Sequence, residues 1–461
     1  MNRSTKLGLA GLAGVALLTA LPAWAQAPVA AAAKPFVPTA AMVNKGDTAW
    51  MLTSSVLVLM MSVPGLALFY GGLVRTKNML SVLMQVFMIV CIAALVWVSW
   101  GYSMAFTGGS QFVGGFGKLF LKGVDANSLA ATFSNGVYIP EYAYVCFQMT
   151  FACITPALIV GAFAERVKFT PLMVFMVAWM TIVYFPIAHM VWYWAGPDFL
   201  PNAPTDFGFL YGKGALDFAG GTVVHINAGI AGLVGCLVIG KRAGFNKEPM
   251  PPHSLTMTMI GASLLWVGWF GFNAGSALEA NGSAGLAMLN TFVATASAGL
   301  AWMLIERVNG HKGSALGFCS GIIAGLVAVT PAAGNSGPFG AIILGAVASV
   351  VCYYAVTFLK PKLGYDDALD AFGIHGIGGM IGAIGTGIVY APAFGGPGKP
   401  DFDMGHQLFV QIAAVATTIV WAAIGTVIAI YVAKALTGLR VSPEVEAEGL
   451  DIGEHGERAY N

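Results

Sequence analysis

Apolar residues fill long stretches of this chain, and short polar segments divide one stretch from the next. Eleven stretches are long enough to cross the hydrocarbon core of a bilayer as a helix, which takes about 20 residues. Several contain Gly or Pro, which a membrane tolerates where protein or a cavity satisfies the backbone. The pattern predicts an all-α polytopic membrane protein whose eleven transmembrane helices lie near 49–74, 79–106, 142–163, 171–194, 219–240, 255–273, 285–305, 314–331, 338–359, 371–391 and 407–435.

The first apolar run differs from the others. Arg3 and Lys6 precede an apolar run over 7–21, and Ala-Trp-Ala at 23–25 matches a small-residue cleavage site. This arrangement predicts a secretory signal peptide, and a retained first helix is the alternative. The expected organisation is a signal peptide (1–25), a periplasmic N-terminal tail (26–46), a transmembrane domain (47–436) and a cytoplasmic C-terminal tail (437–461).

Composition supports the membrane as the solvent of this chain. Charged residues make up 9% of it and hydrophobic residues 57%, against about 25% charged in soluble domains. A chain so poor in charge does not cover a soluble surface. The formal net charge of +1 lacks the basic excess of a nucleic-acid-binding protein. We therefore expect membrane lipid, and no nucleic acid, around this protein.

The basic residues predict the orientation. Most of the 22 lysines and arginines fall in alternate loops or after the last span, among them Arg75, Lys77, Arg166, Lys241 and Arg242. Loops with excess Lys and Arg face the cytoplasm. An external N-terminus and an odd number of spans also bring the C-terminus inside, so both arguments predict a cytoplasmic C-terminus.

A weak repeat links the fifth and tenth spans. The motif DFAGGTVVH begins at Asp217 and ends at His225, and the motif DAFGIH begins at Asp370 and ends at His375. Five spans followed by five more reverse the direction of the second set, as in inverted-repeat transporters. We therefore expect an inverted five-plus-five repeat with an added eleventh helix.

His225 and His375 are the ionisable residues that most need an explanation. Such groups are unfavourable inside a bilayer and usually mark a pathway. A neutral imidazole donates from one nitrogen and accepts at the other, so two of them can form a polar strip in an apolar pore. The alternative is a pair of histidines bonded to backbone carbonyls. No HxxxH or HExxH motif is present, and we expect neither a metal site nor a cofactor.

Aromatic residues and Asp217 are further candidates. Trp192 ends a span, Phe147 and Phe151 share a helix face, and Phe272 lies in GWFGFNAGS (268–276). A tryptophan at a span end is usually an interfacial anchor, and a minority bind cations through the ring. Lone phenylalanines are usually core or lipid-facing. Asp217 is suited to cap a helix and to add negative potential near a cation site.

These motifs resemble the ammonium transporter (Amt/Rh) family, and most of all its bacterial Amt branch. The resemblance rests on FYGGLVRTKN (69–78), FACIT (151–155), DFAGGTVVHIN (217–227), GWFGFNAGS (268–276) and FGIHG (372–376), and it runs from about residue 46 to Tyr460.

The resemblance implies a homotrimer with one pore in each subunit. It implies that Trp192, Ser276 and Phe151 recruit NH4+ in an outer vestibule that Phe147 lines and near which Asp217 lies. Phe151 and Phe272 would stack as a gate, and His225 and His375 would be the twin histidines of the pore. Ammonia, with or without a separately moving proton, would cross the inner (plasma) membrane into the cytoplasm.

The C-terminal residues also resemble the family. The segment 438–460 is similar to the cytoplasmic region that helps to dock a PII-type nitrogen signalling protein, although its composition alone suggests a solvated acidic tail. An ammonium sensor and an Rh-type gas channel are the alternative functions. An enzyme is not expected, because the chain has no recognisable nucleophile–base or metal constellation.

Overall fold

The computed structural model describes residues 36–199, 205–399 and 401–460. The predicted signal peptide lies outside these residues. Residues from Pro38 onward form one unit. Within the described residues 11 helical segments are long and apolar enough to cross a membrane, which confirms the predicted number. They are Lys45–Leu73, Thr76–Phe106, Glu141–Phe163, Phe169–Trp192, Gly221–Ile239, Leu255–Gly275, Gly282–Val308, Ala315–Ala332, Pro338–Leu363, Phe372–Val389 and Met404–Thr437.

Four of the 11 spans in the described residues are single continuous α-helices, six contain a wider π-helical turn, and one ends in a 3₁₀ turn. The α-helices of the spans are α2 (Lys45–Met60), α3 (Ala67–Leu73), α4 (Met79–Val96), α5 (Tyr102–Phe106), α6 (Glu141–Phe163), α7 (Phe169–Trp179), α8 (Phe185–Trp192), α10 (Asn227–Ile239), α11 (Leu255–Gly275), α12 (Gly282–Val308), α13 (Ala315–Val329), α14 (Pro338–Tyr354), α15 (Lys360–Leu363), α16 (Ile377–Val389) and α17 (Met404–Thr437). The π-helical turns are Met61–Leu66, Trp97–Gly101, Met180–Tyr184, Gly221–Ile226, Ala355–Leu359 and Phe372–Gly376.

The remaining elements are short. The strands β1 (Leu129–Ala131) and β2 (Tyr138–Pro140) pair antiparallel, with Leu129 opposite Pro140. The other short helices are α9 (Phe209–Gly212), α18 (Pro443–Glu448), α19 (Leu450–His455) and the 3₁₀ turns Ala40–Met42, Thr76–Asn78, Leu119–Leu121, Thr330–Ala332 and Pro392–Phe394.

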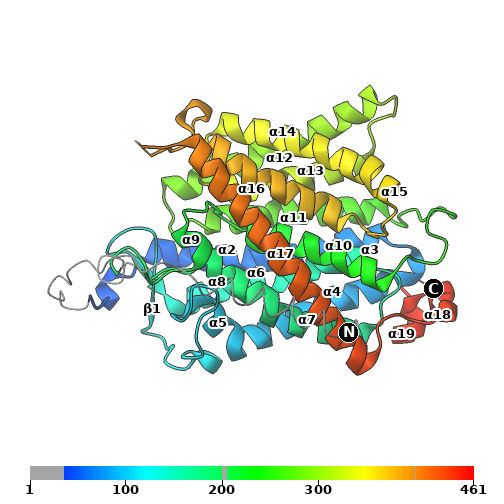
Figure 1. Cartoon of the computed structure of the whole chain (residues 1–461), viewed down its shortest axis with the longest axis horizontal. Coiled ribbons are helices and arrows are strands. Elements are labelled where there is room, and N and C mark those ends of the chain that lie inside the picture. The colour runs from blue at the N-terminus through cyan, green and yellow to red at the C-terminus, as the bar shows by residue number, and fades with distance from the viewer. Residues whose placement is uncertain (1–35, 200–204, 400, 461) are drawn as a thin grey trace, which may run out of the picture. The chain divides into compact units, whose positions relative to one another are not determined.

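The helices pack around a shared interior. α12 lies against α13 and α14, α11 lies against α2 and α3, and the long α17 crosses α7, α10 and α16 (Figure 1). The fifth and tenth spans approach closely where Gly229 meets Gly376, and a Cβ at Gly229 would clash with the backbone of Gly376. Small residues allow such close backbone approach between membrane helices. This contact holds two helix starts side by side in the interior.

The two helix starts repeat one another. Asp217 accepts hydrogen bonds from the amides of Gly220 and Gly221, both at 2.7 Å. Asp367 accepts from the amides of Ala371 and Phe372 at 3.0 and 2.7 Å. Each aspartate satisfies backbone donors that a helix start leaves free, and Asp217 precedes His225 by the same number of residues as Asp367 precedes His375.

The counterpart of Asp217 is therefore Asp367, and the expectation that it is Asp370 was wrong. Asp370 has a positive φ of 61° and forms an ion pair with Lys360. Its left-handed backbone keeps it outside the helix start. The matching aspartate caps and the two π-helical turns that contain the histidines support the repeat.

The C-terminal residues fold back onto one end of the bundle, which we call the tail end (Figure 1). Asp451 accepts from the amides of Leu80 and Ser81 at 3.1 and 2.8 Å, at the start of α4. Glu446 accepts from the amide of Ala243 at 2.6 Å and pairs with Arg440 at 2.7 Å. These contacts tie α18 to the loop that holds Ala243 and α19 to the start of α4.

A buried charge network lies beneath this tail. Glu165 contacts Arg75 at 2.8 Å and Arg242 at 3.0 Å, and Arg242 also contacts Asp366 at 2.8 Å. Burial favours the protonated form of Asp366, but the hydrogen bonds and charge of Arg242 hold its pKa below the usual value. The network joins the loops after the first, third, fifth and ninth spans into one rigid layer.

Candidate functional site

His225 and His375 meet in the interior. Their side chains are 1% and 4% exposed, their Nδ1 atoms are 3.2 Å apart, and their rings are nearly parallel at 19° with centroids 5.3 Å apart. A hydrogen bond between two Nδ1 atoms needs one donor and one acceptor, so one imidazole carries its proton on Nδ1 and the other accepts there. The alternative of two histidines tied to backbone carbonyls does not describe this pair.

A small apolar cavity, which we call the pore pocket, adjoins the histidines. It holds about 10 Å³ and is lined by His225, His375, Trp269 and Phe272, together with Met61, Leu66, Phe69, Ile154, Leu158, Val224, Leu265 and Ile323. That volume accommodates roughly one water-sized molecule. Nε2 of His225 has no hydrogen-bond partner among the described residues. The pocket thus combines apolar walls with a free imidazole nitrogen.

Trp269 is a residue of this pocket that the sequence analysis missed. Its ring stacks on His225 at a centroid distance of 5.4 Å and an angle of 22°, and its Nε1 donates to Oγ1 of Thr330 at 2.8 Å. Trp269 and Phe272 stand three residues apart on α11 and so share a helix face. The three-residue spacing of Trp269 and Phe272 within GWFGFNAGS is the sequence feature that could have identified Trp269.

Two phenylalanine rings separate the pore pocket from a wider cavity. Phe151 on α6 and Phe272 on α11 have centroids 4.2 Å apart at an angle of 31°, and their side chains are 1% and 0% exposed. Phe272 lines the pore pocket, and Phe151 lines the wider cavity. The rings form an apolar partition between the two spaces.

The wider cavity, which we call the vestibule, holds about 310 Å³. The ring of Trp192 stands edge-on to Phe151, with centroids 5.6 Å apart at 89°. Ser276 donates its hydroxyl to the carbonyl of Phe272 at 2.8 Å, which leaves its oxygen lone pairs free to accept. The residues predicted for recruitment all line this cavity: Phe147, Phe151, Trp192, Asp217 and Ser276.

Asp217 holds the vestibule wall in place. Its carbonyl oxygen accepts from Nε1 of Trp192 at 3.0 Å, which fixes the indole ring. Its carboxylate accepts from backbone amides of the fifth span and from the Thr222 hydroxyl. The carboxylate oxygens are thus engaged by protein donors, and Asp217 adds negative charge to the vestibule while it orients Trp192.

A third cavity, the tail-side cavity, adjoins the pore pocket. It holds about 370 Å³ and is lined by His375, Lys360, Asp370 and Arg242, among others. His375 lines this cavity as well as the pore pocket, as do Phe69 and Ile323, so the two spaces adjoin at these residues, whereas His225 lines the pore pocket alone. Every predicted site residue therefore lines the vestibule or the pore pocket, which the phenylalanine pair separates, and the tail-side cavity adjoins the pore pocket at His375.

Metal chemistry has no support in this series. Within residues 36–199, 205–399 and 401–460, no group of three or more His, Cys, Asp or Glu side chains is placed to hold a metal ion. The arrangement instead offers ring faces, isolated acceptors and two imidazoles in an apolar interior. It is suited to a small polar molecule that moves through a membrane helix bundle.

Comparisons with known proteins agree with this class. Residues 49–460 match the model of the Ammonium Transporter Family. The chain is 48% identical to an ammonium transporter of Aquifex aeolicus, over 91% of this chain and 95% of that protein. It is 45% identical to an ammonium transporter of Bacillus subtilis, over 90% and 98%.

A solved structure gives the same result for the fold. Saccharomyces cerevisiae Mep2 superposes with a TM-score of 0.76 at 34% identity, over 87% of this chain and 89% of that one. The chain belongs to the Ammonium Transporter Family, whose members are transporters rather than enzymes. Its activity is therefore ammonium transport, and the expectation of a non-enzyme is confirmed.

Proposed function

We propose that NH4+ is recruited in the vestibule and that ammonia passes between the phenylalanine rings and along His225 and His375. The single observation that carries this proposal is the series of spaces: Phe151 and Phe272 separate a wide vestibule from a pocket of about 10 Å³ that both histidines line, and His375 also lines a second wide cavity. A fully hydrated ion does not fit that pocket.

The chemistry of the vestibule favours ammonium. A cation gains energy over the faces of aromatic rings such as Trp192. An ammonium ion also donates N–H hydrogen bonds, for which the Ser276 oxygen is an acceptor, whereas K+ has no N–H to donate. Beyond the vestibule, loss of a proton removes the cost of moving a bare charge through apolar surroundings. The hydrogen bond between His225 and His375 gives a proton a separate route.

Trp192→Leu is expected to raise the ammonium concentration for half-maximal transport roughly thirtyfold, because a desolvated cation–ring contact is worth ~2 kcal/mol. The measurement is initial transport rate against ammonium concentration in liposomes that contain the purified protein. Trp266→Leu is the matched control, since Trp266 lies on α11 against Phe292 and lines none of the three cavities. Equal half-maximal concentrations in the two variants would reject recruitment by Trp192.

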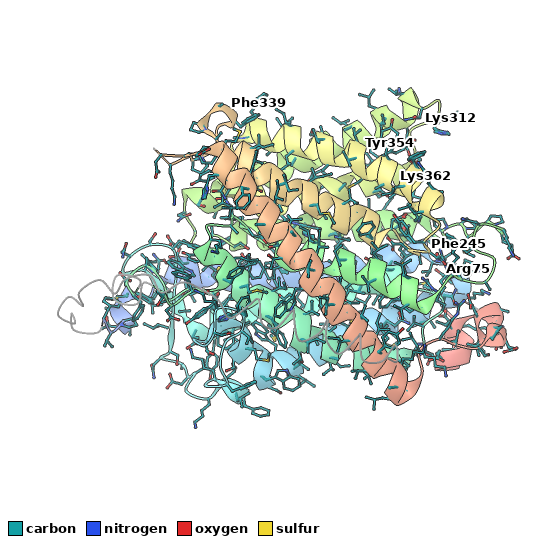
Figure 2. The ribbon with its side chains drawn as sticks, viewed as in Figure 1. Arg75, Phe245, Lys312, Phe339, Tyr354 and Lys362 are labelled. Atoms are coloured by element: carbon teal, nitrogen blue, oxygen red, sulfur yellow. The ribbon has the colours of Figure 1, made fainter. Side chains whose placement is uncertain are left out.

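We also propose that the tail end faces the cytoplasm of the cell and that the protein lies in the inner (plasma) membrane. Arg75, Lys312 and Lys362 gather at the tail end, and Phe339 lies at the opposite end (Figure 2). An excess of basic residues on one side marks the cytoplasmic face. This orientation makes the vestibule periplasmic and agrees with removal of residues 1–25 as a signal peptide.

A PII-type signalling protein is proposed to bind this cytoplasmic face with the help of residues 437–461. The support is the resemblance of the tail together with its anchoring through Glu446 and Asp451. A homotrimer is proposed on the same resemblance, and light scattering on the detergent-solubilised protein should then give three times the chain mass.

Inside-out membrane vesicles are expected to bind a purified PII-type protein, whereas right-side-out vesicles are not. Deletion of residues 440–461 should abolish or strongly weaken that binding while ammonium transport remains, because these residues lie outside the spans. Binding is measured by co-sedimentation. Undiminished binding to the truncated protein would show that docking uses other surfaces, and binding to right-side-out vesicles alone would reverse the orientation.

A further inference from the structure

Gln148 lies in the vestibule wall, where the function proposed above gives it no role. It follows Phe147 on α6 and lines the vestibule with Phe151, Trp192 and Ser276. Its side chain is only 8% exposed. A polar amide held this deep in an aromatic wall requires a hydrogen-bonding explanation.

The protein supplies only part of that explanation. Nε2 of Gln148 donates to the hydroxyl of Tyr144 over 3.5 Å, at the long limit of a hydrogen bond. Oε1 is buried and has no partner among the described residues. A buried amide oxygen without a donor is unfavourable, and it becomes favourable when a donor arrives.

The residues that line the vestibule indicate which kind of hydrogen-bond donor is suited to Gln148 Oε1. Among the described residues that line it, none is Lys, Arg or His, and one is acidic, Asp217. The oxygens of the Asp217 carboxylate are engaged by backbone amides. The wall therefore offers negative charge, ring faces and polar acceptors, among them the unpartnered Gln148 Oε1, but no Lys, Arg or His. A small cation that carries N–H donors is complementary to this wall.

We infer that Gln148 Oε1 is a second hydrogen-bond acceptor for ammonium in the vestibule, beside the Ser276 oxygen, and that it helps to discriminate ammonium from K+. This inference rests on the recruitment proposed above. The four N–H groups of NH4+ can engage two separated acceptors while the rings stabilise its charge. K+ needs several oxygen ligands to replace its hydration shell, and the Gln148 and Ser276 oxygens alone do not supply them.

The test is the concentration dependence of ammonium transport in proteoliposomes. Gln148→Leu is expected to raise the half-maximal ammonium concentration about tenfold, since a hydrogen bond to a charged group is lost, and to leave the maximal rate close to that of the unaltered protein. Gln148→Glu keeps acceptor oxygens at this position and should have a half-maximal concentration at or below that of the unaltered protein. Gln148→Met, unbranched and of similar length, replaces the Leu variant if that one does not fold.

Gln85→Leu is the matched control. Gln85 on α4 is also buried, at 2% exposed, and its Oε1 also has no partner in the described part of the chain, but it lines none of the three cavities. Its loss should leave the half-maximal concentration unchanged.

The possible results separate this inference from the proposed function. If Gln148→Leu behaves like Gln85→Leu while Trp192→Leu still weakens recruitment, the role of Gln148 is overturned and the vestibule site stands. If Trp192→Leu and Gln148→Leu both leave the half-maximal concentration unchanged, the recruitment proposal fails as well. A tenfold rise that Gln148→Glu also shows would mean that packing, and not an acceptor, matters at this position.

Discussion

His225→Asp is expected to lower the selectivity for ammonium over K+ about a hundredfold, because the free-energy cost of a charge at the middle of a membrane helix is ~2.5–3.5 kcal/mol. The native pore pocket offers neutral imidazoles and apolar walls, so a bare cation finds no compensating charge there. A carboxylate at position 225 would supply that charge. The new site would attract K+ as well as NH4+, because simple cation attraction does not require N–H donors.

The measurement is the ratio of ammonium to K+ currents in bilayers that contain the purified variant. His311→Asp is the control, since His311 is exposed in the loop after α12 and lies on none of the cavities. It should keep the native ratio. A His225→Asp protein that assembles, transports ammonium and still excludes K+ would show that the histidines do not set the charge barrier.

Asp217→Ala is expected to destabilise the folded protein by at least ~3 kcal/mol, because each buried backbone N–H left without an acceptor costs about 1–3 kcal/mol. The carboxylate accepts from the amides of Gly220, Gly221 and Thr222 at 2.7, 2.7 and 2.8 Å. Gly220, Gly221 and Thr222 are themselves buried, so loss of the carboxylate removes the protein acceptor of their amides. The alanine variant should also lose ammonium recruitment, because the fifth span would no longer hold the carbonyl that orients Trp192.

Thermal unfolding of the detergent-solubilised protein tests this prediction. Asp403→Ala is the comparison, since Asp403 caps α17 at an exposed site and accepts from the amides of Gly405 and His406. Loss of an exposed cap costs ~1 kcal/mol. If the two variants unfold at the same temperature, the internal cap is not what holds the fifth span.

The spans could be predicted because their apolar runs are long. The histidine pair could be predicted because an ionisable group inside a span is energetically unfavourable. An apolar run of span length has few alternatives, and a histidine inside one needs a partner. The repeated motifs in the fifth and tenth spans predicted that His225 and His375 are each other's partner. The structure confirms that contact through the 3.2 Å separation of their Nδ1 atoms.

Other features depended on tertiary contacts that the sequence does not state. Asp366, Asp367 and Asp370 all precede His375, and only the backbone shows that Asp367 caps the helix while Asp370 turns away through its positive φ. Trp269 looks like an ordinary core residue in an apolar span, and Gln148 is one of several buried amides in the spans, with Gln85 and Gln411. The importance of Trp269 and Gln148 appears only when α6 and α11 are brought together around the pore pocket and the vestibule.

The π-helical turns were also outside the reach of the sequence pattern. Gly221–Ile226 contains His225, and Phe372–Gly376 contains His375. Such turns occur often at functional sites, and their wider backbone aims a side chain differently from a regular helix. Hydrophobic periodicity does not distinguish them from an α-helix, so the ring geometry of the pair required the structure.

We expect this pore to take ammonium and to exclude cations that cannot donate N–H hydrogen bonds. This expectation is tested most directly by rapid pulses of ammonium, K+ or Na+ onto the purified protein in a solid-supported bilayer, with an internal pH indicator in matched liposomes. We expect ammonium alone to give a response that saturates with concentration and exceeds that of protein-free membranes, either as a current or as an internal pH change. A K+ or Na+ response of the same size, or an ammonium response no larger than that of protein-free membranes, would contradict the account.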